Sequence, residues 1–381
     1  MNHPTHHFFE FTPETFTQWC SLHRMPKFRA KQVFEWVYEK GVVDPQQMTN
    51  LSNSDRALLE SQISFLSGPT VAHQLATDGT QKLLIEWMDD ADMKIAAAEA
   101  AVTPSDRLPI LGQDMPYSNT ARQTETVMIP AMDTDRKTAC VSSQIGCPVG
   151  CKFCATGIGG LDGNLSAGRI VEQVWRLNQL KGVDRISNVV FMGMGEPLAN
   201  FAPVVHAVRT LAAPWGMGIS ARKITVSTVG MHKAIEKLAT ELELPVTLAL
   251  SLHAPNDHLR RQLIPWAEFT TIEQLIKACT TWFEKTGREI TLEYILLGGK
   301  NDLPEHAMEL ATIVKKLRAN VNLIRYNEVR GLKFERPTGD AVHHFQRVLR
   351  EQGVNCHIRA SRGRDIAAAC GQLRHEHTTK E

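Results

Sequence analysis

The strongest constraint on the fold is an alternation of apolar strand-like runs with helical segments, which begins near residue 125 of this 381-residue chain. The predicted strands lie at 138–143, 188–195, 223–228, 246–253, 291–297 and 321–327, with a shorter seventh at 354–359. The predicted helices lie near 168–181, 202–213, 231–241, 271–286, 303–318 and 338–352. Such alternation predicts a parallel sheet with crossover helices, and six units indicate a full or partial (β/α)6 barrel of the TIM-like kind.

The first third of the chain has a different pattern. Residues 13–66 have apolar residues at helical spacing, and 71–88 has the pattern of two strands joined by a turn at Asp78-Gly79. The sequence therefore predicts a small N-terminal helical domain with a short β extension beside the barrel. The expected divisions are a disordered tail at 1–12, an accessory domain at 13–88, an insertion or linker at 89–122, the core at 123–375 and a tail at 376–381.

Bulk composition is that of an ordinary globular protein, with 43% hydrophobic and 22% charged residues and a net charge of +1. No apolar run is long enough to span a bilayer, and the N-terminus does not resemble a signal peptide, so we expect a cytoplasmic protein. Local charge is more informative than net charge. Basic residues cluster near both ends of the chain and could hold a phosphate backbone, although composition alone favours two solvent-exposed basic faces. These residues are Arg24, Lys27, Arg29, Lys31, Arg359, Arg362 and Arg364.

Three closely spaced cysteines, Cys147, Cys151 and Cys154, form the motif C-x3-C-x2-C. This spacing suits three corners of a [4Fe-4S] cluster whose fourth iron stays open, unlike the ferredoxin motif with its fourth cysteine. An open iron can bind the amino and carboxylate groups of S-adenosylmethionine (SAM) and pass it an electron. Cys151 and Cys154 alone would also suit half a zinc site or a redox pair, but a structural zinc needs four ligands and no second C-x2-C follows.

Polar residues end several of the predicted strands, where the chemistry of such barrels is located. Each alone would be read as an ordinary hydrogen-bonded group. Together they indicate a ligand site, in which a carboxylate beside glycines holds an ammonium group and the others hold the ribose and carboxylate of the same ligand. The candidates are Gly195, Glu196, Ser227, Ser251, Leu252, His253 and Asn327.

Two further cysteines stand apart from the motif. Cys140 lies on the first predicted strand of the core, and Cys370 follows the basic stretch 359–364. A lone cysteine is usually a buried, inert residue, whereas a thiol beside cationic residues can be a nucleophile. The residues alone leave both interpretations of Cys370 open.

Several motifs together resemble the RlmN/Cfr family of radical SAM adenine methyltransferases. They are F-R-A-K-Q-V-F-E-W-V-Y-E-K-G-V, E-T-V-M-I-P, C-V-S-S-Q-I-G-C-P-V-G-C-K-F-C-A-T-G, G-M-G-E-P-L, I-T-V-S-T-V-G, L-S-L-H-A-P-N-D-H-L-R-R-Q-L-I-P and R-G-R-D-I-A-A-A-C-G-Q-L. They occur in the family's order and cover about residues 20–88 and 124–373.

The resemblance implies a route that uses two SAM molecules. The first methylates Cys370, and the second is cleaved at the [4Fe-4S] cluster to a radical that takes hydrogen from the S-methyl group. The resulting methylene adds to adenine. Glu125 is then the proton acceptor, and Cys140 resolves the protein–RNA adduct and leaves a disulfide with Cys370. The strand-end residues named above match the family's SAM contacts.

The resemblance also implies the partners. The expected substrates are an adenine of 23S rRNA, methylated at C2, and the adenine 3′ of the anticodon in tRNA. Methylation of C8 or of another RNA adenine is the alternative, and a non-catalytic, metal-stabilised RNA-binding protein is a remote one. The accessory domain at 13–88, with its basic helices, is expected to bind the RNA. A flavodoxin-type or other electron donor and a monomeric state are expected. Departures from the family pattern at Gly163, Arg169, Arg325 and Glu328 are interpreted as positions that could contact RNA.

Overall fold

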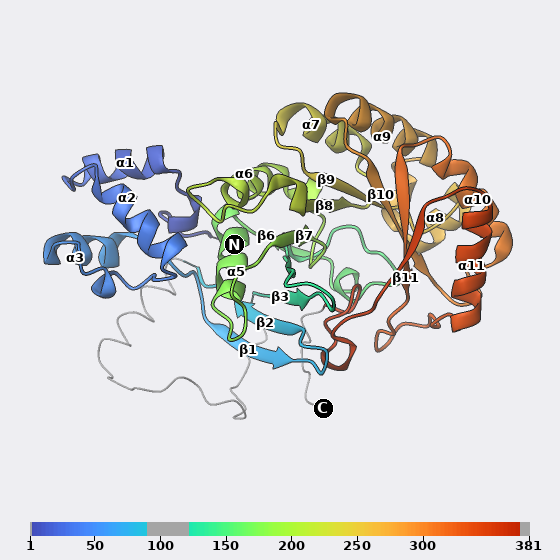
Figure 1. The fold of residues 1–381 in the computed structure, drawn as a ribbon, viewed down its shortest axis with the longest axis horizontal. Coiled ribbons are helices and arrows are strands. Elements are labelled where there is room, and N and C mark those ends of the chain that lie inside the picture. Colours follow the sequence, from blue (N-terminus) through green and yellow to red (C-terminus); the bar gives the residue numbers. More distant parts are fainter. Residues whose placement is uncertain (1, 90–121, 374–381) are drawn as a thin grey trace.

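A computed structural model describes residues 2–89 and 122–373 of the chain (Figure 1). In these residues the main sheet has ten strands, which lie side by side in chain order apart from the small hairpin β5–β6 (Gln144–Gly146, Leu161–Asn164). The strands are β1 (Thr70–Leu75), β2 (Gln81–Glu86), β3 (Gln123–Pro130), β4 (Lys137–Cys140), β7 (Asn188–Phe191), β8 (Ile224–Thr228), β9 (Thr247–Ser251), β10 (Ile290–Leu296), β11 (Ala319–Arg325) and β12 (Cys356–Arg359).

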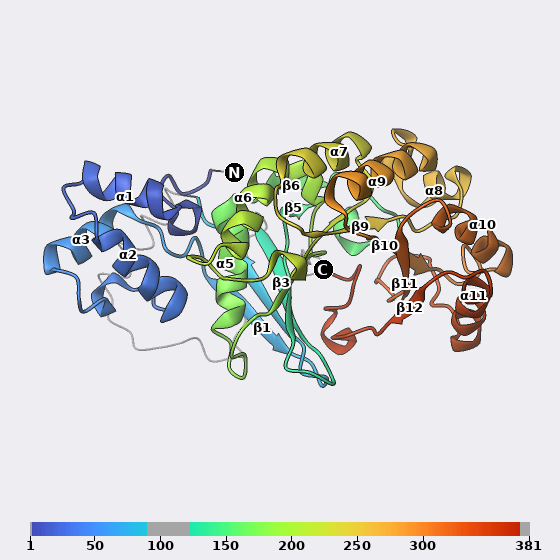
Figure 2. The same ribbon diagram turned by 45° about the horizontal axis from the view of Figure 1, so that its top comes forward.

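The strands from β4 to β12 pair in parallel, and helices connect them across the outer face (Figures 1 and 2). The helices are α5 (Ala167–Asn178), α6 (Phe201–Ala212), α7 (His232–Glu241), α9 (Ile272–Thr286), α10 (Pro304–Val314) and α11 (Gly339–Glu351), with a short α8 (Asp257–Leu263) that was not predicted. Because β12 does not pair with β4, the barrel is partial. The predicted α/β barrel class and its alternation are confirmed.

Side-chain caps begin several of the barrel helices. Thr271 and Gln274 form a capping box at the start of α9, and the Ser166 hydroxyl accepts a hydrogen bond from the Arg169 amide at the start of α5. These bonds satisfy backbone amides that have no partner within the helix. The caps set the starts of α5 at Ala167 and of α9 at Ile272, whereas the preceding barrel strands β4 and β9 end at Cys140 and Ser251. Long loops therefore lie between strand and helix at this edge of the sheet, where they can form a site.

The N-terminal domain contains α1 (Pro13–Leu22), α2 (Arg29–Phe34) and α3 (Asn53–Gln62), which lie together beside α5 in both views (Figures 1 and 2). The prediction that residues 1–12 form a disordered tail was wrong for the described residues 2–12. Phe8 and Phe9 are fully buried, and Phe8 packs against Phe16 and Phe65 with ring centroids 5.5 and 5.1 Å away. Burial of two large aromatic side chains offsets the entropy of ordering this segment.

The β1–β2 hairpin was predicted with its turn, but its place in the molecule differs from the expected division at 13–88. β2 pairs antiparallel with β3, and β3 with β4, so the hairpin extends the core sheet. The carboxylate of Asp89 and the guanidinium of Arg122 pair at 2.9 Å, which joins the two ends of the predicted insertion. Residues 90–121 and the predicted tail at 376–381 lie outside the described residues.

An ionic network joins the N-terminal domain to α5. Glu172 is fully buried and accepts hydrogen bonds from the backbone and hydroxyl of Ser67, while Arg176 and His7 pair with its carboxylate. Arg169 is also fully buried and donates to the carbonyl of Met88. The interpretation of Arg169 as an RNA-contacting position was therefore wrong, because its side chain is buried within this network and cannot reach RNA.

Among the described residues, no helix is both long enough and apolar enough to cross a membrane.

Candidate active site

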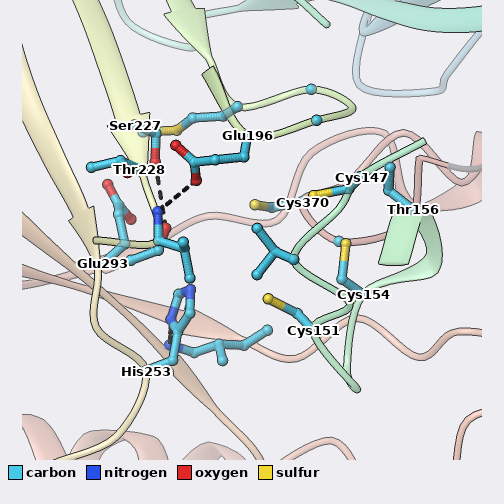
Figure 3. Close-up of a pocket in the computed structure, with 18 of the residues that line it drawn as sticks. Cys147, Cys151, Cys154, Thr156, Glu196, Ser227, Thr228, His253, Glu293 and Cys370 are labelled. Atoms are coloured by element: carbon cyan, nitrogen blue, oxygen red, sulfur yellow. Dashed lines mark hydrogen bonds between the residues drawn. The ribbon is translucent and has the colours of Figure 1, made fainter. Parts of the chain in front are cut away.

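A cavity of about 140 Å³ opens at the carboxyl ends of the parallel strands and brings together most of the predicted site residues (Figure 3). Four cysteines lie on one side of the view, and Glu196, Ser227, Thr228 and Glu293 lie on the other. Of the predicted residues, those that line the cavity are Cys147, Cys151, Cys154, Gly195, Glu196, Ser227, Ser251, His253 and Cys370. Glu125, Cys140, Leu252 and Asn327 are not among the lining residues.

The three cysteines of the motif fit the ligand set of an iron–sulfur cluster. All three line the cavity and pack against one apolar cluster. Burial raises the pKa of each thiol, that of Cys147 to about 12, and the mutual repulsion of the thiolates raises the pKa of Cys151 further. A cationic cluster would stabilise the thiolate forms. In the described residues no three potential ligands converge on a single metal ion, but each thiolate of a cubane cluster binds a different iron.

Glu196 is held rigidly by backbone amides. Its carboxylate accepts hydrogen bonds from the amides of Leu198 and Val229, at 3.0 and 2.7 Å. Burial nevertheless raises the pKa of Glu196 to about 7. The adjacent Gly195 has φ of +100°, and a Cβ there would lie 2.6 Å from that of Gln144, so only glycine fits at this strand end. A buried carboxylate of this kind is suited to an ammonium group of a ligand.

A row of polar groups crosses three neighbouring strands opposite the cysteines. The hydroxyls of Ser227 on β8 and Ser251 on β9 lie 3.4 Å apart, and Glu293 on β10 is in register with Ser251. Glu293 is 3% exposed, and its Oε2 has no hydrogen-bond partner, although Arg359 Nη1 lies 4.0 Å away. Glu293 could not be predicted as a site residue from sequence patterns, because a single glutamate inside the apolar run 291–297 resembles an ordinary strand residue.

His253 is a neutral imidazole in the cavity wall. Burial, followed by the charge of Arg260, lowers the pKa of His253 to about 3. Its Nδ1 accepts a hydrogen bond from the amide of Ile295, so the proton resides on Nε2. The φ of His253 is +59°, which is unusual for a residue with a Cβ. Leu252, by contrast, is buried in the main core, with its carbonyl bonded by Arg260.

The thiols of Cys370 and Cys140 both lie within electrostatic range of Arg359. Cys370 lines the cavity, and the side-chain Nδ2 of Asn327 donates a hydrogen bond to the Cys370 carbonyl at 3.4 Å. Cys140 is buried on β4, in the apolar cluster that adjoins the segment before Cys370. Burial raises the pKa of both thiols, and the charge of Arg359 acts in the opposite direction on both. Arg359 is thus a cavity residue rather than part of a surface basic patch. All eight cysteines are free thiols in this structure.

Glu125 lies behind the cavity on β3, with its side chain buried. Lys82 on β2 pairs with it, Nζ to Oε1 at 2.5 Å, and Lys82 Nζ also lies 3.4 Å from the carbonyl oxygen of Ala367. Lys82 could not be predicted as a buried residue from the sequence either, because a lysine on a strand usually faces solvent. The pair connects the β1–β2 hairpin to the segment that carries Cys370.

Comparison with known proteins agrees with this architecture. Residues 141–311 match the family model "Radical SAM superfamily", and residues 7–64 match the "Ribosomal RNA large subunit methyltransferase N-terminal domain". The partial barrel with its cysteine loop is the fold of a radical SAM enzyme, a class that uses SAM and a [4Fe-4S] cluster.

Individual relatives are similar over almost the whole chain. A "Probable dual-specificity RNA methyltransferase RlmN" of Rhodopirellula baltica is 38% identical over 97% of this chain and 90% of its own length. A protein of the same description from Synechococcus sp. (strain CC9902) is 41% identical over 95% and 94%. The crystal structure of a radical SAM methyltransferase from Sphaerobacter thermophilus superposes with a TM-score of 0.86, at 37% identity, over 97% of this chain and all of that one. The chain belongs to the RlmN family of radical SAM methyltransferases.

Proposed function

We propose that the protein methylates C2 of an adenine in RNA, with 23S rRNA and tRNA as substrates, through a methyl group carried on Cys370. The single observation that carries this proposal is the position of Cys370. A cysteine far along the chain from the motif lies in the same cavity as Cys147, Cys151 and Cys154, with Cys140 nearby. The names of the relatives support RNA as the substrate.

Different residues of the chain would bind the cluster, orient SAM and carry the methyl group. Cys147, Cys151 and Cys154 would hold the cluster, and Glu196, Ser227, Ser251, His253 and Asn327 would orient SAM. A reduced cluster, when bound, supplies the electron that cleaves SAM and so yields a radical able to remove a hydrogen atom. Cys370 Sγ first attacks the methyl carbon of one SAM molecule and takes up the methyl group, with S-adenosylhomocysteine as the leaving group. It then presents the S-methyl group to the radical derived from a second SAM molecule, which removes one hydrogen atom from it. The methylene group formed on Cys370 bonds to the adenine carbon.

Release of the product requires two more groups. The adduct would pass its unpaired electron to the oxidised cluster, and Glu125 then accepts the proton from the adenine carbon, with Lys82 stabilising its carboxylate before that transfer. Cys140 Sγ next attacks Cys370 Sγ. The bond between Cys370 Sγ and the methylene carbon breaks, that carbon takes up a proton to become the methyl group of the base, and a disulfide remains. An external electron donor, of the flavodoxin type or another, must reduce this disulfide and keep the cluster reduced for the next cycle.

The test is an anaerobic assay with reconstituted protein, SAM, dithionite and unmodified 23S rRNA or tRNA, followed by nuclease digestion and mass spectrometry. 2-Methyladenosine from either RNA is the expected product. 8-Methyladenosine would overturn the C2 assignment. Cleavage of SAM without any methyladenosine would overturn both RNA substrates and leave the radical chemistry in place.

A further inference from the structure

The segment that carries Cys370 has little regular structure of its own. After β12 the chain forms one short 3₁₀ turn, Arg364–Ile366, and then runs irregularly to Leu373. Ala367 has φ of +49°, a left-handed conformation that is unfavourable for a residue with a Cβ. A segment of this kind keeps one conformation only if its neighbours hold it.

The part after Cys370 is anchored to the cysteine loop. The amide of Ala155 donates to the carbonyl of Gly371 at 2.8 Å, and the Thr156 hydroxyl donates to the carbonyl of Leu373 at 2.6 Å. This anchor belongs to the site already described.

The part before Cys370 is anchored by the β1–β2 hairpin, which lies almost 290 residues away in sequence. The carboxylate of Asp78 accepts a hydrogen bond from the amide of Gly363 at 3.0 Å and lies 4.0 Å from Arg362. In the opposite direction, the amide of Thr77 donates to the carboxylate of Asp365 at 2.9 Å. Figure 1 shows the tip of this hairpin against the loop that follows β12.

Two further features tighten this contact. Gly363 has φ of +62°, and a Cβ there would lie 2.9 Å from Thr80 Cγ2, so the hairpin packs directly on the backbone. Burial acts to raise the pKa of Asp78, but hydrogen bonds from Thr80 and Gly363, with the charge of Arg362, outweigh it and lower the pKa. Deeper in, Lys82 bridges Glu125 and the carbonyl of Ala367.

We propose that the β1–β2 hairpin is a positioning element for the Cys370 thiol, with Asp78 and Asp365 as the positioning residues and Lys82 as the link to Glu125. The role of Cys370 as methyl carrier rests on the proposed function; the holding of its segment does not. The hairpin holds the thiol at one position in the cavity, although its segment has no regular structure. A thiol that reacts with both SAM and a large substrate needs such a fixed position.

The test measures how fast iodoacetamide alkylates each cysteine of the anaerobically reconstituted protein, by peptide mass spectrometry. Asp78→Ala should raise the rate at Cys370 about tenfold, because a hydrogen bond to a charged group shifts a local opening equilibrium by roughly that factor. Asp365→Ala should act similarly, and Asp78→Asn, which keeps an acceptor for the Gly363 amide, should lie between. Asp184→Ala removes an exposed ion-pairing aspartate elsewhere and serves as the matched control.

The internal references are the buried thiols of Cys20, Cys279 and Cys356. An unchanged rate at Cys370 in both alanine variants, or an equal rise at all buried cysteines, would overturn the proposal. The assay contains no RNA, so its result is independent of whether methyladenosine is formed. If the proposed function also holds, Asp78→Ala should lower kcat and leave the KM for RNA within about twofold of the wild-type value, because the hairpin acts on the thiol.

Discussion

At the scale of single residues, Cys370 and Cys140 occupy different environments that suit different roles. Cys370 is partly exposed and lines the cavity, whereas Cys140 is 7% exposed and lies in an apolar cluster beside it. A methyl carrier has to reach its substrate, while a resolving thiol has to stay protected until the adduct forms. We therefore expect the two cysteine variants to fail at different steps.

Replacement of Cys140 tests this difference. Cys140→Ala should accumulate a covalent protein–RNA adduct, because nothing then attacks the sulfur of Cys370. The measurement is a denaturing gel of protein incubated with SAM, dithionite and labelled RNA. Cys370→Ala is the matched control and should give neither adduct nor methyladenosine, with the absorbance of the cluster retained. Absence of adduct from Cys140→Ala in a protein that still cleaves SAM would argue against the resolving role.

Glu293 offers a second prediction at this scale. Its Oε2 is buried without a hydrogen-bond partner beside two serine hydroxyls, an arrangement that is costly unless a ligand donates to it. Glu293→Gln should weaken SAM binding by about tenfold in equilibrium dialysis, since a hydrogen bond to a charged acceptor contributes about 1.5–3 kcal/mol. Glu289→Gln, at an exposed position just before the same strand, is the control. Equal affinity in both variants would remove Glu293 from the binding site.

At the scale of elements, the network around Glu172 fastens the N-terminal domain to α5. Burial alone would raise the pKa of Glu172, but Arg176, with His7 and Ser67, outweighs burial and lowers the pKa from 4.5 to about 2. A carboxylate with a depressed folded-state pKa contributes stability that is fully present above its unfolded pKa and is lost as the pH falls through the folded value. The contribution should therefore be lost as the pH falls from about 4.5 to about 2.

Glu172→Gln tests this network by denaturant unfolding. The loss at pH 7 should be about 3–5 kcal/mol, because the change leaves the buried Arg176 without its counter-charge. The difference from wild type should shrink as the pH is lowered below 4.5. Glu243→Gln breaks the exposed pair with Arg209 and should cost less than about 1 kcal/mol. A loss independent of pH would mean that packing, rather than charge, holds the interface.

At the scale of the whole molecule, the domain beside the barrel is the element proposed to hold RNA. Lys27 and Lys31 are exposed on it, Lys31 with a surface pair to Glu35 at 3.8 Å, whereas Arg29 is half-buried and paired with Asp55 at 3.1 Å. A folded RNA is recognised largely through its backbone and shape, so solvent-exposed cations on a rigid domain suit it.

Lys27→Glu/Lys31→Glu should weaken RNA binding and lower the slope of log K against log salt by up to about 2, since each phosphate contact contributes roughly 0.7–0.9. Filter binding over a range of salt concentrations measures both. Affinity for SAM should be unchanged, because neither residue approaches the cavity. Lys300→Glu/Lys316→Glu, on exposed positions around α10, is the matched control. An equal effect of the two double variants would mean that RNA binding follows total charge.

Much of this architecture could be predicted from local patterns. Hydrophobic periodicity identified the parallel strands and the helices between them. Each strand and each helix must bury apolar residues, and the spacing of those residues differs between the two kinds of element. The spacing of Cys147, Cys151 and Cys154 identified the cysteine loop, since the close spacing of these residues is a local property of the sequence. The strand-end rule correctly placed Glu196, Ser227, Ser251 and His253 around one cavity.

Contacts between distant parts of the chain required the tertiary structure. The burial of Phe8 and Phe9, the pairing of β2 with β3 and the enclosure of Arg169 all depend on partners that no local pattern reveals. The same is true of Glu293 and Lys82, whose charges are buried only because other strands surround them. Sequence therefore specified which chemistry the chain carries, through residue types at fixed spacing. The folded structure decided which groups face one another, because burial and pairing of charges arise only when segments tens to hundreds of residues apart are packed together.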